Sequence, residues 1–350
     1  MKATIDAKRL GELTHHVTRV LDQDHTAMTV KAADGRLMLE AVGTSTSRAW
    51  LDADVADEGT VVVPGVRFGL YVDAMPSGEV ILSTTDEGLR MKCGRLDVRA
   101  RLLEDGDMPE RPQEPSDLYK VDADAFGPAV ANAVGFAASG KNAQPKLTGV
   151  HLKAHDGSLT VEATDRYHAY SDRMGFDGPD FDVIVPTGRL KDIAAGASAL
   201  AVSGGLLAVR GEGTFDMIPL IGERYVDLSV AFTPERLGCD GDAVFDRAEL
   251  LAATKTLCRL AVDTPVARLD LGAEGMDMTM RQADQDVTQW VGAKVGRTAS
   301  HSLDLTYLTD ALNAVDSDEV RVEAGRNFRF VDKTHPGRLV VVAAHQGGRA

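Results

Sequence analysis

The sequence predicts an α+β protein made of three tandem domains, each with two helices packed on antiparallel sheet. Three patterns predict this fold: a helical segment that begins after an aspartate, a glycine turn that opens an alternating strand, and a β-rich run that leads into a short second helix. Each pattern occurs three times. Two of them keep the same offsets of 122 and 118 residues, shown by the landmarks Gly35, Gly157 and Gly275, and Pro64, Pro186 and Asp304.

The first pattern sets the start of the first helix in each repeat. Asp6, Asp122 and Asp246 precede helical stretches at residues 7–21, 123–137 and 247–261. An aspartate at this position accepts a hydrogen bond from an otherwise unpaired amide of the first turn. A large apolar residue follows four positions after each aspartate, and these residues are Leu10, Phe126 and Leu250.

The other two patterns place the strands and the second helices. Turns at 34–35, 156–157 and 274–275 precede period-two alternation at 36–40, 158–162 and 276–280, which is typical of a hairpin with a half-buried strand. The runs at 61–64, 183–186 and 302–304 lead into helical segments at 67–75, 189–197 and 307–315. A further strand pair follows the second helix, for example 79–82 with 89–92 and 199–202 with 206–210.

Two connections divide the repeats. Residues 104–120 and 222–242 are rich in proline, glycine and charge, which disfavours a core element. We therefore predict domain boundaries at 1–116, 117–238 and 239–350, each near the common size of a domain.

Composition limits the class of protein. Hydrophobic residues make up 44% and charged residues 26%, which fits a globular chain, and no apolar run is long enough to span a membrane. The N-terminus has no apolar signal region, so a cytoplasmic location is expected. The formal charge of −15 argues against a simple nucleic-acid binder but allows contact through one limited face.

The cysteines exclude two further kinds of site. Cys93, Cys239 and Cys258 are odd in number and far apart, so a disulfide framework and a CxxC-type zinc site are both excluded. We expect neither a metal nor a cofactor.

Several short motifs occur in the order found in one known family. They are Met-Lys-Ala-Thr-Ile at 1–5, Gly-Thr-Val-Val-Val-Pro at 59–64, Lys-Leu-Thr-Gly-Val at 146–150, Ala-Thr-Asp at 163–165, Val-Ile-Val-Pro at 183–186 and Leu-Thr-Asp-Ala-Leu-Asn-Ala at 308–314. In order, spacing and coverage the chain resembles the beta subunit of bacterial DNA polymerase III, the beta sliding clamp family, as a divergent or bacteriophage-type member.

The resemblance implies a non-catalytic processivity factor. Two crescent-shaped chains would close head to tail into a ring of six domains around double-stranded DNA, without reading its sequence. The implied partners are duplex DNA, a DNA polymerase, an ATP-dependent clamp loader and a second copy of the chain. The implied location is the replication fork of a bacterial or phage-infected cell.

The resemblance also implies a DNA-facing surface on the helices. The cations expected there are Lys8 and Arg19 in the first repeat, Lys141 and Lys146 in the second, and Lys255 and Arg259 in the third. Such cations would meet phosphates, which position a protein without specifying a sequence. The alternative is that these side chains only solvate exposed helix faces. The second repeat departs from the pattern, because its exposed helix positions Pro128, Ala131 and Gly135 carry no charge.

A partner-peptide cleft is implied at the Ala-Thr-Asp motif. Its residues would be Leu147, Thr164, Arg166, Tyr167, His168 and Ala169, joined by Val341, Val342 and Ala343 of the C-terminal strand. Two departures alter this cleft. His168-Ala169 replaces the usual Arg-Leu pair, and residues 339–345, followed by the tail 346–350, replace the usual Met-Pro-Met ending.

Two other interpretations compete with peptide docking on a clamp. Asp165 and His168 could form the acid–base pair of a hydrolase, although the chain has no Gly-x-Ser-x-Gly, HExxH or P-loop motif. The chain could also be a clamp-like scaffold that does not encircle DNA. For the ring, we predict a dimer interface between the edge strand near Leu96 and Val98 and the region around Leu257, Cys258 and Leu260.

Overall fold

The computed structural model describes residues 1–104 and 108–345, except for the side chain of Pro234. Part of the first predicted connection, residues 105–107, and the predicted tail, residues 346–350, lie outside the described residues. The chain forms two compact units. The first holds Met1–Ala123 with Gly196–Leu220, and the second holds the described residues of Asp124–Ala195 with Ile221–Ala350.

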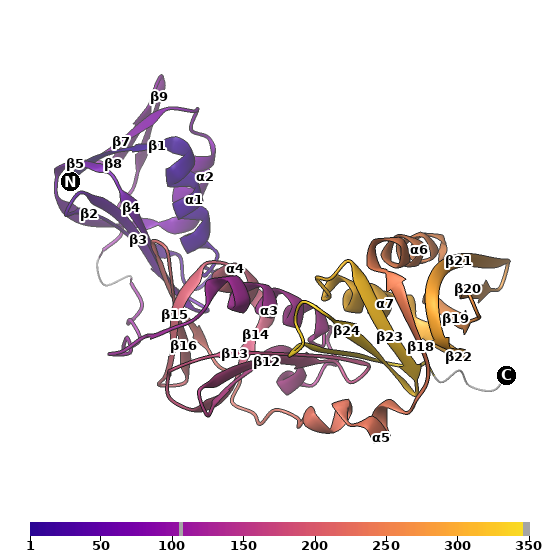
Figure 1. The fold of residues 1–350 in the computed structure, drawn as a ribbon. Helices are drawn as coiled ribbons and strands as arrows, with labels where there is room; N and C mark the ends of the chain where they lie inside the picture. The colour runs from indigo at the N-terminus through magenta and orange to yellow at the C-terminus, as the bar shows by residue number, and fades with distance from the viewer. Residues whose placement is uncertain (105–107, 346–350) are drawn as a thin grey trace. The chain divides into compact units, whose positions relative to one another are not determined.

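The first unit has two helices and two antiparallel sheets. Helices α1 (Ala7–Thr18) and α2 (Gly65–Asp73) lie side by side (Figure 1). The sheets have the strand orders β5-β1-β7-β8-β9 and β10-β15-β16-β17-β4-β3-β2-β6. The strands are β1 (Lys2–Asp6), β2 (Ala27–Ala33), β3 (Arg36–Val42), β4 (Thr46–Asp52), β5 (Asp54–Asp57), β6 (Gly59–Pro64), β7 (Glu79–Thr85), β8 (Gly88–Cys93), β9 (Leu96–Ala100), β10 (Tyr119–Lys120), β15 (Ala197–Ser203), β16 (Leu206–Gly211) and β17 (Thr214–Pro219).

The start and the buried face of α1 follow from its sequence. The Asp6 carboxylate accepts hydrogen bonds from the amides of Lys8 and Arg9, as expected of an N-cap. One stripe of the helix is buried at helical spacing and includes Leu10 and Val17, both fully buried. Each such side chain contributes about 1.5–3 kcal/mol relative to exposure, so the stripe holds the helix on the sheet.

The second unit holds the remaining helices and one twelve-stranded antiparallel sheet. Its strand order is β14-β11-β12-β13-β25-β24-β23-β18-β21-β20-β19-β22. The helices are α3 (Ala123–Phe136), α4 (Thr187–Ala194), α5 (Pro234–Leu237), α6 (Arg247–Leu260), α7 (Leu305–Asn313) and the 3-10 turns η2 (Pro145–Leu147) and η3 (Ser229–Phe232). The strands are β11 (Gly149–His155), β12 (Ser158–Thr164), β13 (His168–Gly175), β14 (Phe181–Pro186), β18 (Cys239–Asp246), β19 (Val266–Leu271), β20 (Gly275–Gln282), β21 (Gln285–Arg297), β22 (Ala299–Asp304), β23 (Glu319–Gly325), β24 (Asn327–Asp332) and β25 (Leu339–Ala343).

The pairing of β13 with β25 joins the centre of the chain to its C-terminal strand. His168 lies opposite Val342 and Ala169 lies opposite Val341. Just before β25, the buried Arg338 guanidinium contacts the carboxylates of Asp172, at 2.9 Å, and Asp332, at 3.3 Å. This charge network links β13 to β24 through the residue that immediately precedes β25, so it supports the pairing of β25 with both strands.

The structure confirms the α+β class and the recurring helices and hairpins, with two local differences. Asp34-Gly35 and Asp156-Gly157 all have positive φ, as a type I′ hairpin turn requires. Gly275 instead lies within β20. A Cβ atom there would come within 2.4 Å of the Val291 carbonyl oxygen, so close packing rather than a turn requires this glycine.

The second predicted connection is more ordered than its composition indicated. Residues 222–242 contain η3, α5 and the start of β18, and they bury Tyr225 and Leu228. The segment covers apolar sheet surface, which offsets its polar composition. In each compact unit, strands from different predicted domains pair with each other. In the first unit β17 pairs with β4, and in the second unit β13 pairs with β25. The boundaries of the three domains therefore stay a prediction.

Candidate functional site

A cavity of about 370 Å³ lies beside the turn between β12 and β13. Seven of the nine residues predicted for the cleft line it: Thr164, Arg166, Tyr167, His168, Ala169, Val341 and Ala343. The rest of the lining comes from three other places. The segment after β17 and η3 give Val226, Asp227, Leu228, Val230 and Ala231, α5 gives Arg236, and the start of β24 gives Asn327. The cavity is thus built from parts of the chain far apart in sequence.

The turn that carries the cleft residues is held by side-chain hydrogen bonds. The Thr164 hydroxyl donates to the His168 carbonyl oxygen at 2.6 Å and accepts from the Arg166 amide at 2.9 Å. The Asp165 carboxylate accepts from the amides of Tyr167 and His168 at 2.8 and 2.9 Å. These bonds hold Arg166 at φ 85°, a strained conformation for a residue with a side chain.

His168 is a buried part of this support. Its side chain is 3% exposed, its Nδ1 lies 2.7 Å from an Asp165 oxygen, and its Nε2 lies 3.3 Å from the Gly135 carbonyl oxygen. The ring stacks on Phe136 at 4.4 Å and contacts Tyr307 at 4.5 Å. Burial alone would raise the pKa of Asp165, but hydrogen bonds and the charge of His168 outweigh it and hold that pKa below its usual value.

This geometry favours a structural role for the Asp165–His168 pair over the hydrolase interpretation. The Asp165 oxygen that contacts the imidazole also accepts two backbone amides. A general base must reach the proton it abstracts, and here both ring nitrogens already face protein atoms.

The exposed rim of the cavity carries the aromatic ring of Tyr167. Tyr167 is 62% exposed and stacks on Tyr307 of α7, with ring centroids 6.1 Å apart. Burial, with the nearby Asp165 carboxylate, raises the pKa of the Tyr307 hydroxyl. Burial also raises the pKa of Asp310 on the same helix. A flat, partly apolar rim of this kind suits contact with a peptide side chain.

Two predicted cleft residues need correction. Leu147 and Val342 are not among the residues that line the cavity, and their side chains are 1% and 0% exposed. Val342 follows a lining residue on a strand, and successive side chains of a strand point to opposite faces. Leu147 packs beneath the cleft with Ala169, Ile184, Tyr225 and Leu228. The wall at 226–231 was missed because it lies within a connection rich in glycine, proline and charge, although residues 226–230 themselves alternate apolar and polar side chains.

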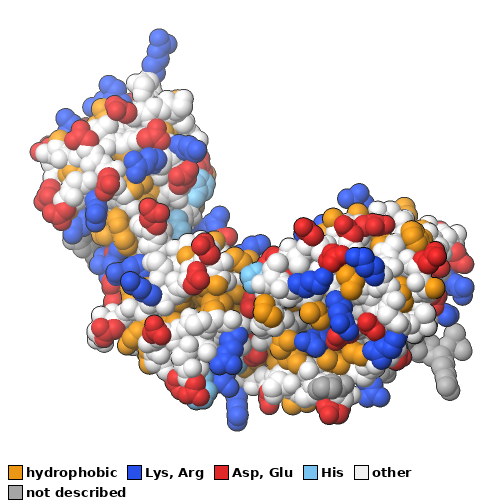
Figure 2. All heavy atoms as spheres, in the orientation of Figure 1, with side chains coloured by type: hydrophobic (Ala, Val, Ile, Leu, Met, Phe, Trp, Pro, Cys, Tyr) orange, Lys and Arg blue, Asp and Glu red, His pale blue; other side chains and the backbone are white. Residues whose placement is uncertain are grey.

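The cations predicted to face DNA lie at exposed or half-buried positions. Lys8 is on α1, Arg19 follows it, and Lys255 and Arg259 are on α6. Lys141 follows α3 and Lys146 lies in the half-buried turn η2. On the face drawn in Figure 2, acidic and basic side chains are interspersed. The exposed positions of α3 that carry no charge include Pro128 and Gly135.

The residues predicted for the dimer interface are only partly available. Leu96 and Val98 are half-buried on β9, which is an edge strand of its sheet. Cys258 is half-buried and Leu260 is 46% exposed, but Leu257 is fully buried against the core and cannot contribute its side chain to a surface. Exposed apolar residues not predicted from the sequence include Val66 and Leu70 on α2, at 51% and 63%, and Val262, at 71%.

One cluster has the composition of a metal site. Within the described ranges 1–104 and 108–345, ligand atoms of Asp316, Asp332 and His335 lie within 4.8 Å of one another. Arg338 already contacts both carboxylates, at 2.7 and 3.3 Å. A guanidinium at this place supplies the positive charge that a metal ion would bring. Within the same ranges, no helix is both long and apolar enough to cross a membrane.

The tandem repeats, the antiparallel sheets with two helices per repeat, and the cavity beside the Ala-Thr-Asp turn define the sliding-clamp class of fold. The chain is 27% identical to the beta sliding clamp of Streptomyces coelicolor over 97% of this chain and 93% of that relative. No protein-family model matches the sequence. The chain is a divergent relative of the bacterial beta sliding clamps.

Solved structures give the same class of fold. The sliding clamp of Bacillus subtilis superposes with a TM-score of 0.88 at 17% identity, covering 99% of this chain and 100% of that one. A sliding clamp of Pseudomonas aeruginosa bound to griselimycin superposes with a TM-score of 0.87 at 17% identity, again covering 99% and 100%. The fold is therefore shared over nearly the whole chain.

Proposed function

We propose that this protein is a DNA polymerase processivity factor, a sliding clamp that encircles duplex DNA and tethers polymerase through the cleft beside β13. The observation that carries the proposal is the full-length likeness to beta sliding clamps in both sequence and fold. Such a clamp is a non-catalytic accessory subunit. It acts as a topological tether at the replication fork in the cytoplasm, where an ATP-dependent loader opens it.

The cleft is the proposed docking site for partner peptides. Its lining combines an exposed aromatic rim with small side chains, Ala169, Ala231 and Ala343, at the cavity wall. His168 is buried below the rim and supports the turn. Because small residues replace the larger ones usual in the family, the cleft has room for a bulky apolar side chain of a partner.

The ring would form by head-to-tail pairing of two chains. Supporting this, the first unit offers the edge strand β9 and the exposed Val66 and Leu70, while the second unit offers Leu260 and Val262 at and after the end of α6. Unpaired edge strands and exposed apolar patches both favour association. The proposed interface keeps the predicted residues Leu96, Val98, Cys258 and Leu260. It leaves out the buried Leu257 and adds the exposed Val66, Leu70 and Val262.

The test of the tether is retention on closed DNA. The protein is loaded with a bacterial clamp loader and ATP onto nicked circular plasmid, and the complex is separated by gel filtration. We expect retention in salt that disrupts ordinary phosphate contacts, and release after the plasmid is linearised, because an encircling ring can then slide off the ends. Equal retention on circular and linear plasmid would contradict encirclement.

A clamp-like scaffold that does not encircle DNA is the second candidate. The uncharged exposed positions of α3 and the formal charge of −15 favour it. A Lys255→Glu/Arg259→Glu variant separates the two interpretations. A DNA-encircling clamp should lose salt-sensitive DNA affinity in this variant, whereas a scaffold should keep its partner binding and show no DNA effect. Lys31→Glu, an exposed change on strand β2 and not on a helix, is the matched control.

A further inference from the structure

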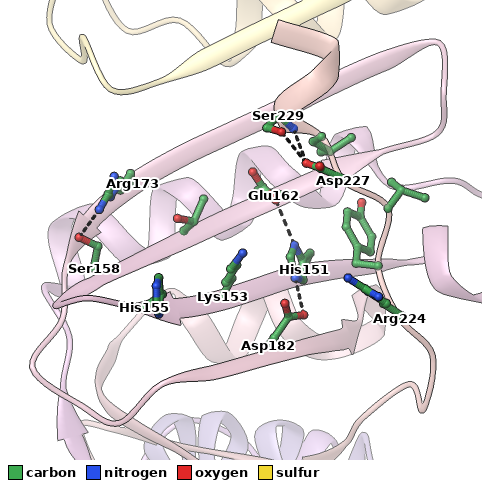
Figure 3. Close-up of a pocket in the computed structure, with 14 residues that line it drawn as sticks. His151, Lys153, His155, Ser158, Glu162, Arg173, Asp182, Arg224, Asp227 and Ser229 are labelled. Atoms are coloured by element: carbon green, nitrogen blue, oxygen red, sulfur yellow. Dashed lines mark hydrogen bonds and ion pairs between the residues drawn. The ribbon is translucent and has the colours of Figure 1, made fainter. Parts of the chain in front are cut away.

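A second, larger cavity lies on the same sheet as the cleft. Its volume is about 650 Å³, and alternate residues of β11 and β12 point into it, as the pleat of a strand requires (Figure 3). In contrast to the cleft, its lining is polar and charged. The residues that matter for its chemistry are His151, Lys153, Glu162, Arg173, Asp182 and Arg224.

The floor of this second cavity is a buried histidine between two carboxylates. His151 is 5% exposed, with Nδ1 3.0 Å from a Glu162 oxygen and Nε2 2.9 Å from an Asp182 oxygen. Its ring stacks on Tyr225 at 4.5 Å. Glu162 also accepts from the Ser171 hydroxyl at 3.0 Å. The Glu162 side chain is thus largely covered, at 17% exposed, whereas the Asp182 side chain is 59% exposed.

The cations at the cavity have few acidic partners. Lys153, Arg173 and Arg224 are all exposed, and Arg173 donates to the Ser158 hydroxyl at 2.9 Å. Within residues 1–104 and 108–345, neither Lys153 nor Arg224 makes a hydrogen bond or a salt bridge. The Asp227 carboxylate interacts electrostatically with both cations, but its hydrogen bonds come from the amide and the hydroxyl of Ser229.

The second cavity adjoins the cleft. Val226, Asp227 and Leu228 line both of them. On β12, Thr164 lines the cleft and Glu162 lines the second cavity, and these positions are about 7 Å apart along a strand. A peptide leaving the cleft would reach Lys153 and Arg224 within a few residues.

We propose that the second cavity binds acidic side chains of the same partner peptide whose apolar residues occupy the cleft. Lys153 and Arg224 would contact the carboxylates, with Arg173 at the far side. Lys153 and Arg224 are exposed and make no hydrogen bond or salt bridge in the described ranges, so they are complementary to an acidic segment. Such charge complementarity favours the correct partner over others. The proposal rests on the peptide-docking function of the cleft.

The experiment uses a random peptide library displayed on phage and selected against the full-length protein. Wild-type protein is expected to enrich peptides with an apolar core and with Asp or Glu on one side of it. The Lys153→Ser/Arg224→Ser variant should keep the apolar core and lose the acidic preference. Apolar cores without acidic bias in the wild-type selection would overturn this proposal and leave the cleft function intact.

A cleft variant distinguishes failure of peptide docking in the cleft from failure of acidic binding in the second cavity. Ala343→Asp is expected to abolish selection of the apolar core, because it places a charge in the cleft lining. If the wild-type protein enriches no apolar core, or Ala343→Asp leaves that core unchanged, the cleft function fails and this proposal fails with it.

Affinity gives the quantitative check. The best wild-type peptide is labelled and measured by fluorescence anisotropy. Loss of both cations should weaken binding roughly threefold to tenfold at low salt, with a smaller difference at high salt. Lys191→Ser, which removes one positive charge outside both cavities, should leave the affinity unchanged. An equal loss in that control, or no loss in the double variant, would overturn the proposal.

Discussion

At the scale of single residues, Arg166 carries backbone strain at the tip of the cleft turn. Its φ of 85° is disfavoured for any residue with a Cβ atom, and most for a β-branched one. We expect Arg166→Gly to be more stable than Arg166→Val by about 1–2 kcal/mol, measured by urea unfolding of both variants. Equal stability of the two variants would show that the turn relaxes.

The buried charge of Arg338 is important for the stability of the folded protein. Its side chain is 3% exposed and contacts Asp172 and Asp332, whose side chains are 12% and 1% exposed. Arg338→Met leaves these carboxylates without their cation, so we expect a loss of about 3–5 kcal/mol in the free energy of unfolding. Arg321→Met, which removes an exposed guanidinium, should cost less than about 1 kcal/mol in the same assay.

Asp332 makes the same network sensitive to acid. Burial acts to raise its pKa, but the amides of Asp316 and Thr334, the Thr334 hydroxyl and the charge of Arg338 hold it at about 2. Because the folded pKa lies below the unfolded value of 3.8, its contribution is present above pH 4 and is lost as pH falls toward 2.

The measurement is the urea midpoint of wild-type protein and Asp332→Asn across that pH range. The variant should lose less stability than wild type between pH 4 and pH 2, because its amide does not titrate. Parallel curves for the two proteins would contradict this assignment.

At the scale of elements, the cleft is a strand pair plus a segment that covers it. The turn between β12 and β13 supplies the rim, β25 supplies the floor, and the segment from Val226 to Ala231 supplies the wall. Since each part comes from a different region of the chain, its shape depends on the β13–β25 register. A slip of β25 by one residue would turn its two lining side chains, Val341 and Ala343, to the other face.

This architecture decides which substitutions test peptide docking. Tyr167→Ala removes an exposed ring and Ala343→Asp changes the lining, so both should weaken binding of a library-selected peptide without unfolding the protein. Val342→Asp would instead bury a charge at a fully buried position and destabilise the sheet. Circular dichroism separates these cases. Unchanged affinity in both cleft variants would contradict the assignment of this cavity as the peptide-docking site.

At the scale of the whole molecule, the proposed ring depends on association of two chains. Leu260 and Val262 are exposed apolar residues on one unit, and a positive charge placed among them would be left unpaired in an interface core. We expect Leu260→Lys to give monomers by light scattering, where the wild-type protein gives dimers. Thr288→Lys, an exposed change on β21, should stay dimeric. A dimeric Leu260→Lys protein would count against the interface.

Local chemistry made much of the fold readable from the sequence. The helices after Asp6 and Asp246 begin where predicted, because an N-cap needs only its own first turn. The hairpins at Asp34-Gly35 and Asp156-Gly157 follow from backbone preferences of two residues. Helix ends were placed a few residues late, as at α1, because fraying at a C-terminus has no sharp sequence signal.

The sequence alone determined the threefold repeat, the α+β class and the position of the turn between β12 and β13, since these depend on periodicity and short-range hydrogen bonds. Only the tertiary structure decided that His168 and Val342 are buried, that residues 226–231 form a wall, and that Arg338 joins Asp172 across 166 positions of sequence. Such contacts depend on how distant strands pair, and neither composition nor local pattern specifies that register.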